Sequence, residues 1–301
     1  MLIIMDKRIH KHPPNILVSV LRGSRLAVHF FYGMLLAIIY PYLNQTGQRR
    51  TMKIWSRKLL GIFNIGLQIE GPQPGRGEGG CLIVANHISW LDIFVLNAIH
   101  PMRFIAKSEV RTWPFIGWLC QRSGTIFIDR AVRPKSIHQN SSMVNQHLSR
   151  LLKQGACIGL FPEGTTTDGK QVGHFHSALI QPAIETETRL CPIALRYQDQ
   201  DGEMEIAAAF VGDMTLAQSI WKILRCPHLN VLVVFTPALL TANANRRVLA
   251  RTAQAAITQG LQTIGITRQT VVHHQARPFP QIILSSQSAY ALLVDLKQFP
   301  K

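Results

Sequence analysis

Short apolar runs alternate with helical patterns from residue 81 onward, and this alternation restricts the possible folds more than any other feature of the sequence. The runs are rich in β-branched residues and bounded by turn residues; they cover residues 81–85, 102–106, 125–128, 157–161, 192–197 and 231–236. The helical patterns cover residues 90–99, 136–153, 177–187, 216–224 and 245–263. Because the runs are too apolar to have a solvent-facing side, they predict an α/β fold, with a mostly parallel or mixed sheet flanked by helices.

A linker dense in glycine and proline, residues 71–80 (GPQPGRGEGG), precedes this region. Such a segment is typical of a boundary between structural units. We therefore expect a basic, membrane-associated helical segment in residues 1–70 and an α/β domain in residues 81–265. Residues 266–301 show no clear period, and no structure is predicted there.

The N-terminal segment contains eighteen residues, 26–43 (LAVHFFYGMLLAIIYPYL), without a lysine, arginine, aspartate or glutamate. A helix of this length spans about 27 Å, slightly less than the ~30 Å hydrocarbon core of a bilayer. Basic clusters flank it on both sides, in residues 7–25 and 49–58, and the positive-inside rule places both flanks in the cytoplasm. The pattern predicts a helix or bent helical hairpin that dips into one leaflet and contacts membrane lipids at the cytoplasmic face of the inner (cell) membrane.

The charge balance leaves two classes of partner open at first, because the formal net charge is +16. A nucleic-acid binder interleaves aromatic and basic residues and has no use for a long apolar segment, so we expect no nucleic acid as partner. The five cysteines are far apart and form no C-x-x-C pair, which favours reduced thiols over a zinc site or a disulfide framework. Four histidines lack acidic or thiol partners at ligand spacing, and no metal site is predicted; they are His174, His176, His273 and His274.

The first motif that carries chemistry follows the first run, where Asn86-His87-Ile88-Ser89-Trp90-Leu91-Asp92 leads from a strand into a helix. His87 and Asp92 can touch only if His87 lies in the turn and Asp92 in the first turn of the helix. In that arrangement the carboxylate accepts the imidazole N–H, and the other ring nitrogen is free to take a proton from an alcohol. Taken alone, the pair is also compatible with an ordinary helix cap.

Three further clusters follow other runs or begin one. Residues 124–130 (GTIFIDR) end in Arg130, residues 161–169 (FPEGTTTDG) form a hydroxyl-rich loop between glycines, and Pro192 opens a later run. Because the carboxyl ends of parallel strands meet at one edge of a sheet, three of the four clusters are expected to gather there.

In this order and spacing, N-H-x4-D, G-x-I-F-I-x-R, F-P-E-G-T and a proline-led strand resemble the four blocks of the glycerolipid acyltransferases, and especially the bacterial 1-acylglycerol-3-phosphate acyltransferases. The resemblance covers about residues 80–200. It implies His87 as general base with Asp92 as its orienting partner. It further implies residues that hold the polar head of the acceptor, namely Arg130, Glu163, Gly164 and Thr165. Pro192 would belong to the acyl-donor side.

The reaction implied by the resemblance moves an acyl group from acyl-CoA or acyl carrier protein to the hydroxyl of a lysolipid, in the first place 1-acylglycerol-3-phosphate, and needs no cofactor. The absence of a G-x-S-x-G elbow agrees with direct attack by the acceptor hydroxyl. Cys157 and Cys191 begin their runs, away from the reactive loops, and are poor candidates for a nucleophile.

Two departures from the family pattern keep a second acceptor open. Residues 166–168 (TTD) stand where the glycerol-phosphate members usually carry a basic residue, and Phe175-His176 replaces a Phe-Lys pair. Both are shared with a branch that includes the lyso-ornithine lipid acyltransferases. A lipid A-type late acyltransferase is disfavoured by the F-P-E-G-T block, and a non-catalytic lipid-binding protein by the oriented base. Since Arg130 is retained, the phosphate acceptor is the first choice.

Overall fold

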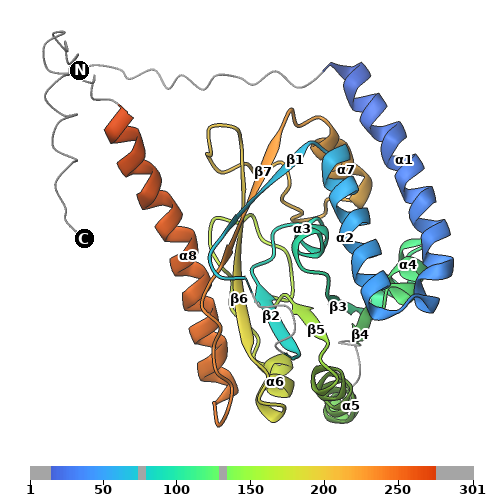
Figure 1. Ribbon diagram of the computed structural model, residues 1–301, viewed down its shortest axis with the longest axis vertical. Coiled ribbons are helices and arrows are strands. Elements are labelled where there is room, and N and C mark those ends of the chain that lie inside the picture. The colour runs from blue at the N-terminus through green and yellow to red at the C-terminus, as the bar shows by residue number, and fades with distance from the viewer. Residues whose placement is uncertain (1–14, 74–78, 129–133, 276–301) are drawn as a thin grey trace, which may run out of the picture. The chain divides into compact units, whose positions relative to one another are not determined.

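The computed structural model describes residues 15–73, 79–128 and 134–275. The chain divides into two compact units, residues 1–262 and 263–301, and the sheet lies in the first. Seven strands form this sheet in the order β1-β7-β6-β2-β5-β3-β4 (Figure 1). The strands are β1 (Ile65–Glu70), β2 (Cys81–Ala85), β3 (Arg103–Lys107), β4 (Ile126–Ile128), β5 (Cys157–Leu160), β6 (Leu190–Gln198) and β7 (Leu229–Phe235).

Neighbouring strands are parallel except β6 and β7, which are antiparallel. The prediction of a mostly parallel or mixed sheet is therefore confirmed. The carboxyl ends of β2 and β5, which precede two of the four motif blocks, lie side by side at one edge of the sheet because these strands pair in parallel.

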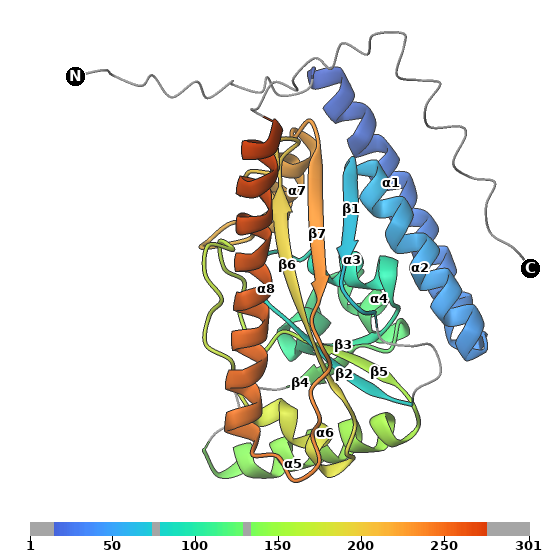
Figure 2. The same ribbon diagram turned by 60° about the vertical axis from the view of Figure 1, so that its left-hand side comes forward.

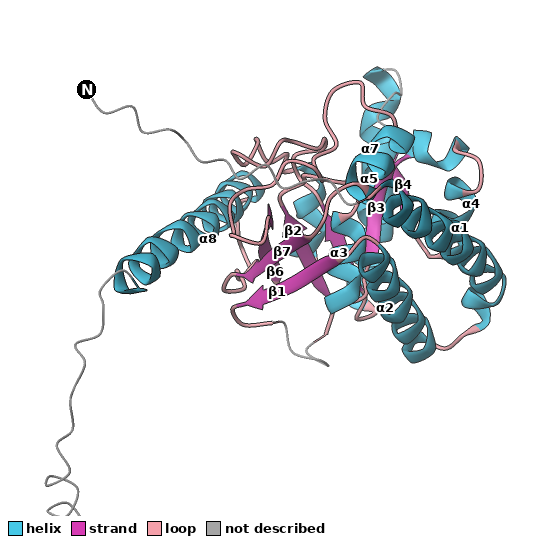
Figure 3. Ribbon diagram, turned by 90° about the horizontal axis from the view of Figure 1, so that it is seen from above, coloured by secondary structure: helices cyan, strands magenta, loops and turns pink. Residues whose placement is uncertain are grey.

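Helices cover both faces of the sheet, as the views in Figures 2 and 3 show. The helices are α1 (Ile16–Ile39), α2 (Gln45–Ile62), α3 (Asp92–Ile99), α4 (Ile116–Arg122), α5 (Pro134–Lys153), α6 (Gln181–Glu185), α7 (Leu216–Leu224) and α8 (Arg246–Gln275), with 3-10 turns at Tyr40–Tyr42, Ser108–Thr112 and Ala178–Ile180. Side chains of α2, α3 and α7 join one hydrophobic core, and side chains of α5, α6 and α8 join the other. Successive residues of β2, Leu82 and Ile83, belong to different cores because strand side chains alternate between faces.

Helices α1 and α2 form a helical hairpin in which α1 faces the protein with its polar and small residues. Ser19, His29 and Gly33 are buried, whereas Leu17 and Phe31 are 71% and 72% exposed. This is the reverse of the usual arrangement in a soluble protein, where the apolar stripe of a helix faces the core. Among the described residues, Ile16–Tyr42 is the one helical stretch long and apolar enough to cross a membrane.

A glycine allows the two helices of the hairpin to approach closely. A Cβ added at Gly33 would lie 2.7 Å from Nε1 of Trp55, closer than real Cβ atoms come to other atoms. The ring of His29 stacks on the same indole with 4.7 Å between ring centroids, and its Nε2 lies 3.1 Å from the Trp55 carbonyl oxygen.

Three sequence expectations about element boundaries need correction. The linker at 71–80 does not separate the sheet from the N-terminal segment, because β1 precedes it and pairs with β7, while Leu59 and Leu60 of α2 belong to the core. Pro192 does not open its strand, since β6 begins at Leu190. Helix α8 continues to Gln275, into the segment for which no structure was predicted; residues 276–301 lie outside the described part of the chain. The strand β1 escaped prediction because its run, Ile65–Glu70, is half exposed and ends in polar residues.

Candidate active site

His87 and Asp92 lie together at the carboxyl end of β2. His87 is in the turn after the strand, and Asp92 is the first residue of α3, so Nδ1 of His87 comes within 2.9 Å of Oδ2 of Asp92. The carboxylate is completely buried, whereas 18% of the imidazole is exposed. This is the arrangement in which the two residues can act as an oriented base.

The carboxylate of Asp92 has hydrogen-bond donors on both oxygens. Oδ2 also accepts the backbone N–H groups of Ile88 at 2.7 Å and Ser89 at 2.9 Å. Oδ1 accepts the hydroxyl of Tyr197 at 2.7 Å. Because Oδ2 already faces two fixed N–H donors, it meets Nδ1 of His87 as an acceptor. We infer that the neutral ring carries its proton on Nδ1 and leaves Nε2 unprotonated.

Tyr197 is a functional residue that sequence reasoning missed. It lies near the end of β6, about 100 residues after Asp92, and no motif marks it. Burial raises the pKa of Tyr197 well above its usual value, and the neighbouring charge of Asp92 raises it further. The phenol therefore stays protonated and keeps donating to Asp92.

Aromatic side chains fix the plane of the imidazole. The ring of His87 stacks on Phe161, with 4.0 Å between centroids and 8° between planes, and Phe161 stacks in turn on Phe104. Among the described residues Nε2 of His87 has no hydrogen-bond partner, so it is available to a substrate.

Glu163 binds the backbone of the site with both carboxylate oxygens. Oε1 accepts the N–H of His87 at 2.7 Å, and Oε2 accepts the N–H of Gly173 at 2.8 Å. Burial raises the pKa of Glu163, and these two hydrogen bonds act in the opposite direction. The geometry thus favours a positioning role for Glu163 over the contact with the acceptor head that the resemblance implied.

The loop after Glu163 crosses over the turn that holds His87. The N–H of Thr167 donates to the carbonyl of His87 at 2.8 Å, and the hydroxyl of Thr166 donates to the carbonyl of Phe210. Gly164 has a φ of +73°, which favours glycine, and Thr165 is exposed.

A cation that directly follows the block 161–169, Lys170, lies in the same loop. The carboxylate of Asp168 is 3.1 Å from Nζ of Lys170, both side chains are exposed, and hydrogen bonds from Lys170 lower the pKa of Asp168. The loop therefore presents an ion pair of Asp168 and Lys170 to solvent. The sequence pattern had indicated only the acid, at a position where related enzymes carry a basic residue.

The remaining expected site residues are placed as follows. Arg130 lies outside the described residues. Pro192 is buried inside β6, in register with Val84, and its carbonyl accepts the hydroxyl of Thr236 at 3.0 Å. Within the part of the chain that the structure describes, no group of three or more histidine, cysteine or acidic residues could hold a metal ion.

Comparison with known proteins identifies the family of the chain. The family described as Acyltransferase matches residues 66–196. A lyso-ornithine lipid O-acyltransferase of Pseudomonas aeruginosa is 33% identical over 223 residues, which cover 74% of this chain and 83% of the relative. A 1-acyl-sn-glycerol-3-phosphate acyltransferase of Neisseria meningitidis serogroup B is 35% identical over 179 residues, which cover 60% and 68% of the two chains.

A solved structure has the same fold. The crystal structure of the 1-acyl-sn-glycerophosphate acyltransferase from Thermotoga maritima superimposes with a TM-score of 0.54 at 17% identity, over 86% of this chain and all of that one. At this identity the likeness concerns the fold, whereas the sequence relatives carry the family assignment. The ordered motif blocks, the fold and these relatives together show that the chain belongs to the acyltransferase family that includes the 1-acylglycerol-3-phosphate and lyso-ornithine lipid enzymes.

Proposed function

We propose that this acyltransferase moves an acyl group from an acyl thioester to the free hydroxyl of a lysolipid, with His87 as general base. The observation that carries the proposal is the buried pair of His87 and Asp92, whose tautomer is fixed by backbone amides and whose Nε2 has no partner among the described residues. The family assignment supplies the reaction class.

In the proposed reaction Nε2 of His87 removes the proton of the acceptor hydroxyl while the oxygen attacks the thioester carbonyl. Asp92 stabilises the imidazolium that forms, since an opposite charge in contact favours the charged ring. The thiolate then leaves as the acyl oxygen bond is completed, and His87 returns the proton to it. The donor is an acyl thioester of CoA or of acyl carrier protein. The proposed step uses no cofactor.

The acceptor that we propose first is 1-acylglycerol-3-phosphate, with Arg130, Gly164 and Thr165 near its head group. An arginine supplies a planar, permanently charged donor fork suited to phosphate. Lys170 adds a cation to the loop that follows these residues.

Lyso-ornithine lipid is the second candidate, because one specific observation favours it. Asp168 offers an exposed carboxylate that could exchange Lys170 for the ammonium of an ornithine head group. The Pseudomonas relative is named a lyso-ornithine lipid O-acyltransferase, and the match with this chain covers 83% of its length.

The deciding experiment offers the purified protein in detergent a labelled acyl thioester with lysophosphatidic acid and lyso-ornithine lipid in parallel. Turnover of either supports lysolipid acylation, and turnover of neither with CoA and acyl carrier protein donors contradicts it. Asp168→Asn, with Lys170→Gln as the matched control, then separates the acceptors. If the carboxylate binds an ammonium, Asp168→Asn impairs the lyso-ornithine reaction alone; an equal effect on both acceptors means that Asp168 only shapes the loop.

We further propose that α1 lies in one leaflet at the cytoplasmic face of the inner membrane. The start of α1 is held against the protein by Arg22, which donates to the carbonyls of Leu224, Cys226 and Pro227 at 2.8 to 3.3 Å. Further along, His29 and Gly33 pack on α2. A helix fastened along its length to the α/β unit exposes only one apolar face, which suits an interface better than a full crossing. Tags at residues 1 and 301 should both report the cytoplasmic side, and a periplasmic N-terminus would contradict the proposal.

A further inference from the structure

Three cysteines that the proposed reaction does not use lie close together near the amino ends of β2, β5 and β6, whereas His87 follows the carboxyl end of β2. Cys81 and Cys157 are the first residues of β2 and β5 and stand directly opposite each other in the parallel register. Their sulfur atoms are 2.7 Å apart, with the thiol of Cys81 donating to Cys157. Cys191 on β6 makes a second hydrogen bond with Cys81.

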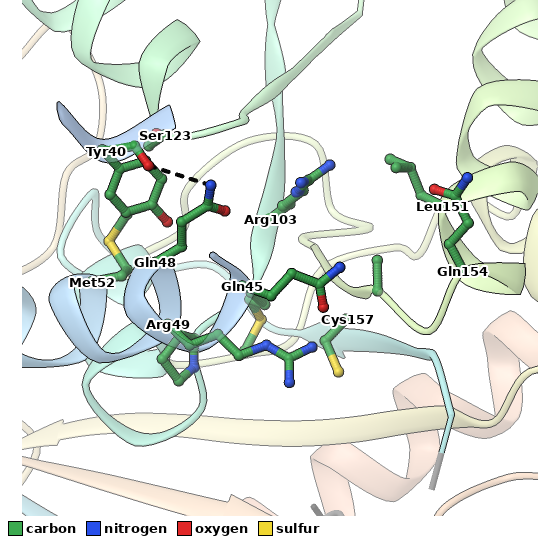
Figure 4. A pocket seen from close by; sticks show the side chains of 13 residues that line it. Tyr40, Gln45, Gln48, Arg49, Met52, Arg103, Ser123, Leu151, Gln154 and Cys157 are labelled. Carbon is green, nitrogen blue, oxygen red and sulfur yellow. Dashed lines mark hydrogen bonds between the residues drawn. The ribbon is translucent and has the colours of Figure 1, made fainter. Parts of the chain in front are cut away.

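Only one member of this cluster can be reached from outside. Cys157 is partly exposed and lines an open cleft between the start of α2 and the first residues of β3 and β5. Figure 4 shows this cleft, with the side chains of Arg49, Arg103 and Gln154 around it and the guanidinium of Arg49 directed toward Cys157. Cys81 and Cys191 are 6% and 5% exposed and lie behind Cys157 in the core.

The two facing thiols differ in acidity. The hydrogen bond from Cys81 lowers the pKa of Cys157, and the charge of Arg49 lowers it further, although burial acts in the opposite direction. Hydrogen bonding to Cys157 and Cys191 and burial raise the pKa of Cys81. Reactive cysteines lie beside a cation, are accessible to solvent and have a lowered pKa; Cys157 has Arg49 beside it, lines the cleft and has its pKa shifted in that direction.

We propose that Cys157 is an oxidation site for small hydroperoxides and that Cys81 is its resolving thiol. The Cys157 thiolate attacks one oxygen of the hydroperoxide, the O–O bond breaks, and Cys157 becomes a sulfenic acid while hydroxide or alkoxide leaves beside Arg49. The Cys81 thiol then attacks the sulfenic sulfur, which forms the Cys81–Cys157 disulfide and releases water. Two thiols are oxidised, and one hydroperoxide is reduced.

The spacing of the two paired strands suits this bond. Neighbouring strands lie about 4.8 Å apart, within the ~4.4–6.8 Å between Cα atoms that a disulfide requires. The same two strands end in the turn of His87 and the loop of Glu163, so the modification would join the two strands that carry the site.

The experiment exposes the purified full-length protein to stoichiometric hydrogen peroxide, blocks remaining thiols with an alkylating agent and maps tryptic peptides. Each cysteine falls in its own peptide, namely 77–103, 112–122, 154–170, 190–196 and 226–246. We expect a cross-link between peptides 77–103 and 154–170 that disappears on reduction. Cys81→Ala should leave Cys157 as a sulfenic acid that dimedone traps, and Arg49→Gln should slow the oxidation of Cys157 several-fold.

Cys120 is the matched control because it is also partly exposed, has no cysteine partner, and has a pKa raised by burial. Cys120→Ser should leave the cross-link unchanged. A wild-type protein in which Cys120 oxidises faster than Cys157, or in which Cys157 links to any peptide other than 77–103, would overturn the proposal.

Discussion

Replacement of Asp92 by asparagine tests the geometry of the site most directly, because the structure dictates how the amide must lie. The Oδ2 position faces the N–H groups of Ile88 and Ser89, so only the carbonyl oxygen of an asparagine fits there. The NH2 group then takes the Oδ1 position, where the Tyr197 hydroxyl can rotate to accept from it. The carbonyl still accepts Nδ1–H of His87, and the tautomer is preserved.

The expected loss is therefore electrostatic. The full attraction of imidazolium and carboxylate, about 4 kcal/mol at ~4 Å and an effective dielectric constant of ~20, sets an upper limit of roughly 10³-fold on the effect on turnover. Since the ring is only partly charged in the transition state, we expect a loss of about 10²–10³-fold. A reversed tautomer, by comparison, costs ~10⁴-fold in the serine protease triad.

The assay combines steady-state turnover with 15N NMR of the histidine ring nitrogens, and Asp92→Ala serves as comparison. Alanine leaves the N–H groups of Ile88 and Ser89 without acceptors, at roughly 1–3 kcal/mol each, so it should lower the free energy of unfolding by more than asparagine does. The reasoning is refuted if neutral His87 in Asp92→Asn carries its proton on Nε2, or if the asparagine and alanine variants are equally inactive and equally unstable.

Three further predictions concern other residues. His87→Ala should lose about 10²–10⁴-fold in turnover while circular dichroism and membrane binding stay normal; near-normal turnover would end the proposed mechanism. Burial raises the pKa of Glu163, so folding favours the protonated carboxyl more than the unfolded chain does. This contribution to stability is fully present below the usual pKa of 4.5 and is lost as the pH rises through the raised pKa. Glu163→Gln should abolish this part of the pH dependence of the melting temperature, and an unchanged profile would contradict the prediction. Phe31→Gln with Leu35→Gln removes exposed apolar area from α1 and should weaken binding to anionic vesicles without lowering the melting temperature, whereas unchanged binding would show that this face does not contact lipid.

Local pattern predicted much of the fold and part of the site. Cys81–Ala85 and Leu216–Leu224 were predicted with the boundaries that the structure shows, because each combines an unbroken apolar pattern with clear turn residues on both sides. His87 and Asp92 could be paired from the sequence because they are five residues apart across one turn, and local geometry leaves them a single way to touch.

Tertiary structure alone decided which distant residues complete the site and which way the surfaces face. Tyr197 reaches Asp92 and Glu163 reaches the backbone of His87 because parallel strands bring their carboxyl ends to one edge, whatever their separation in the chain. The apolar sequence of α1 could not show which side of the helix is exposed. Its polar and small residues face the protein because Arg22 donates hydrogen bonds to backbone carbonyls and Gly33 leaves room for the side chain of Trp55. Such contacts depend on the three-dimensional positions of segments far apart in sequence, and periodicity along the chain carries no information about them.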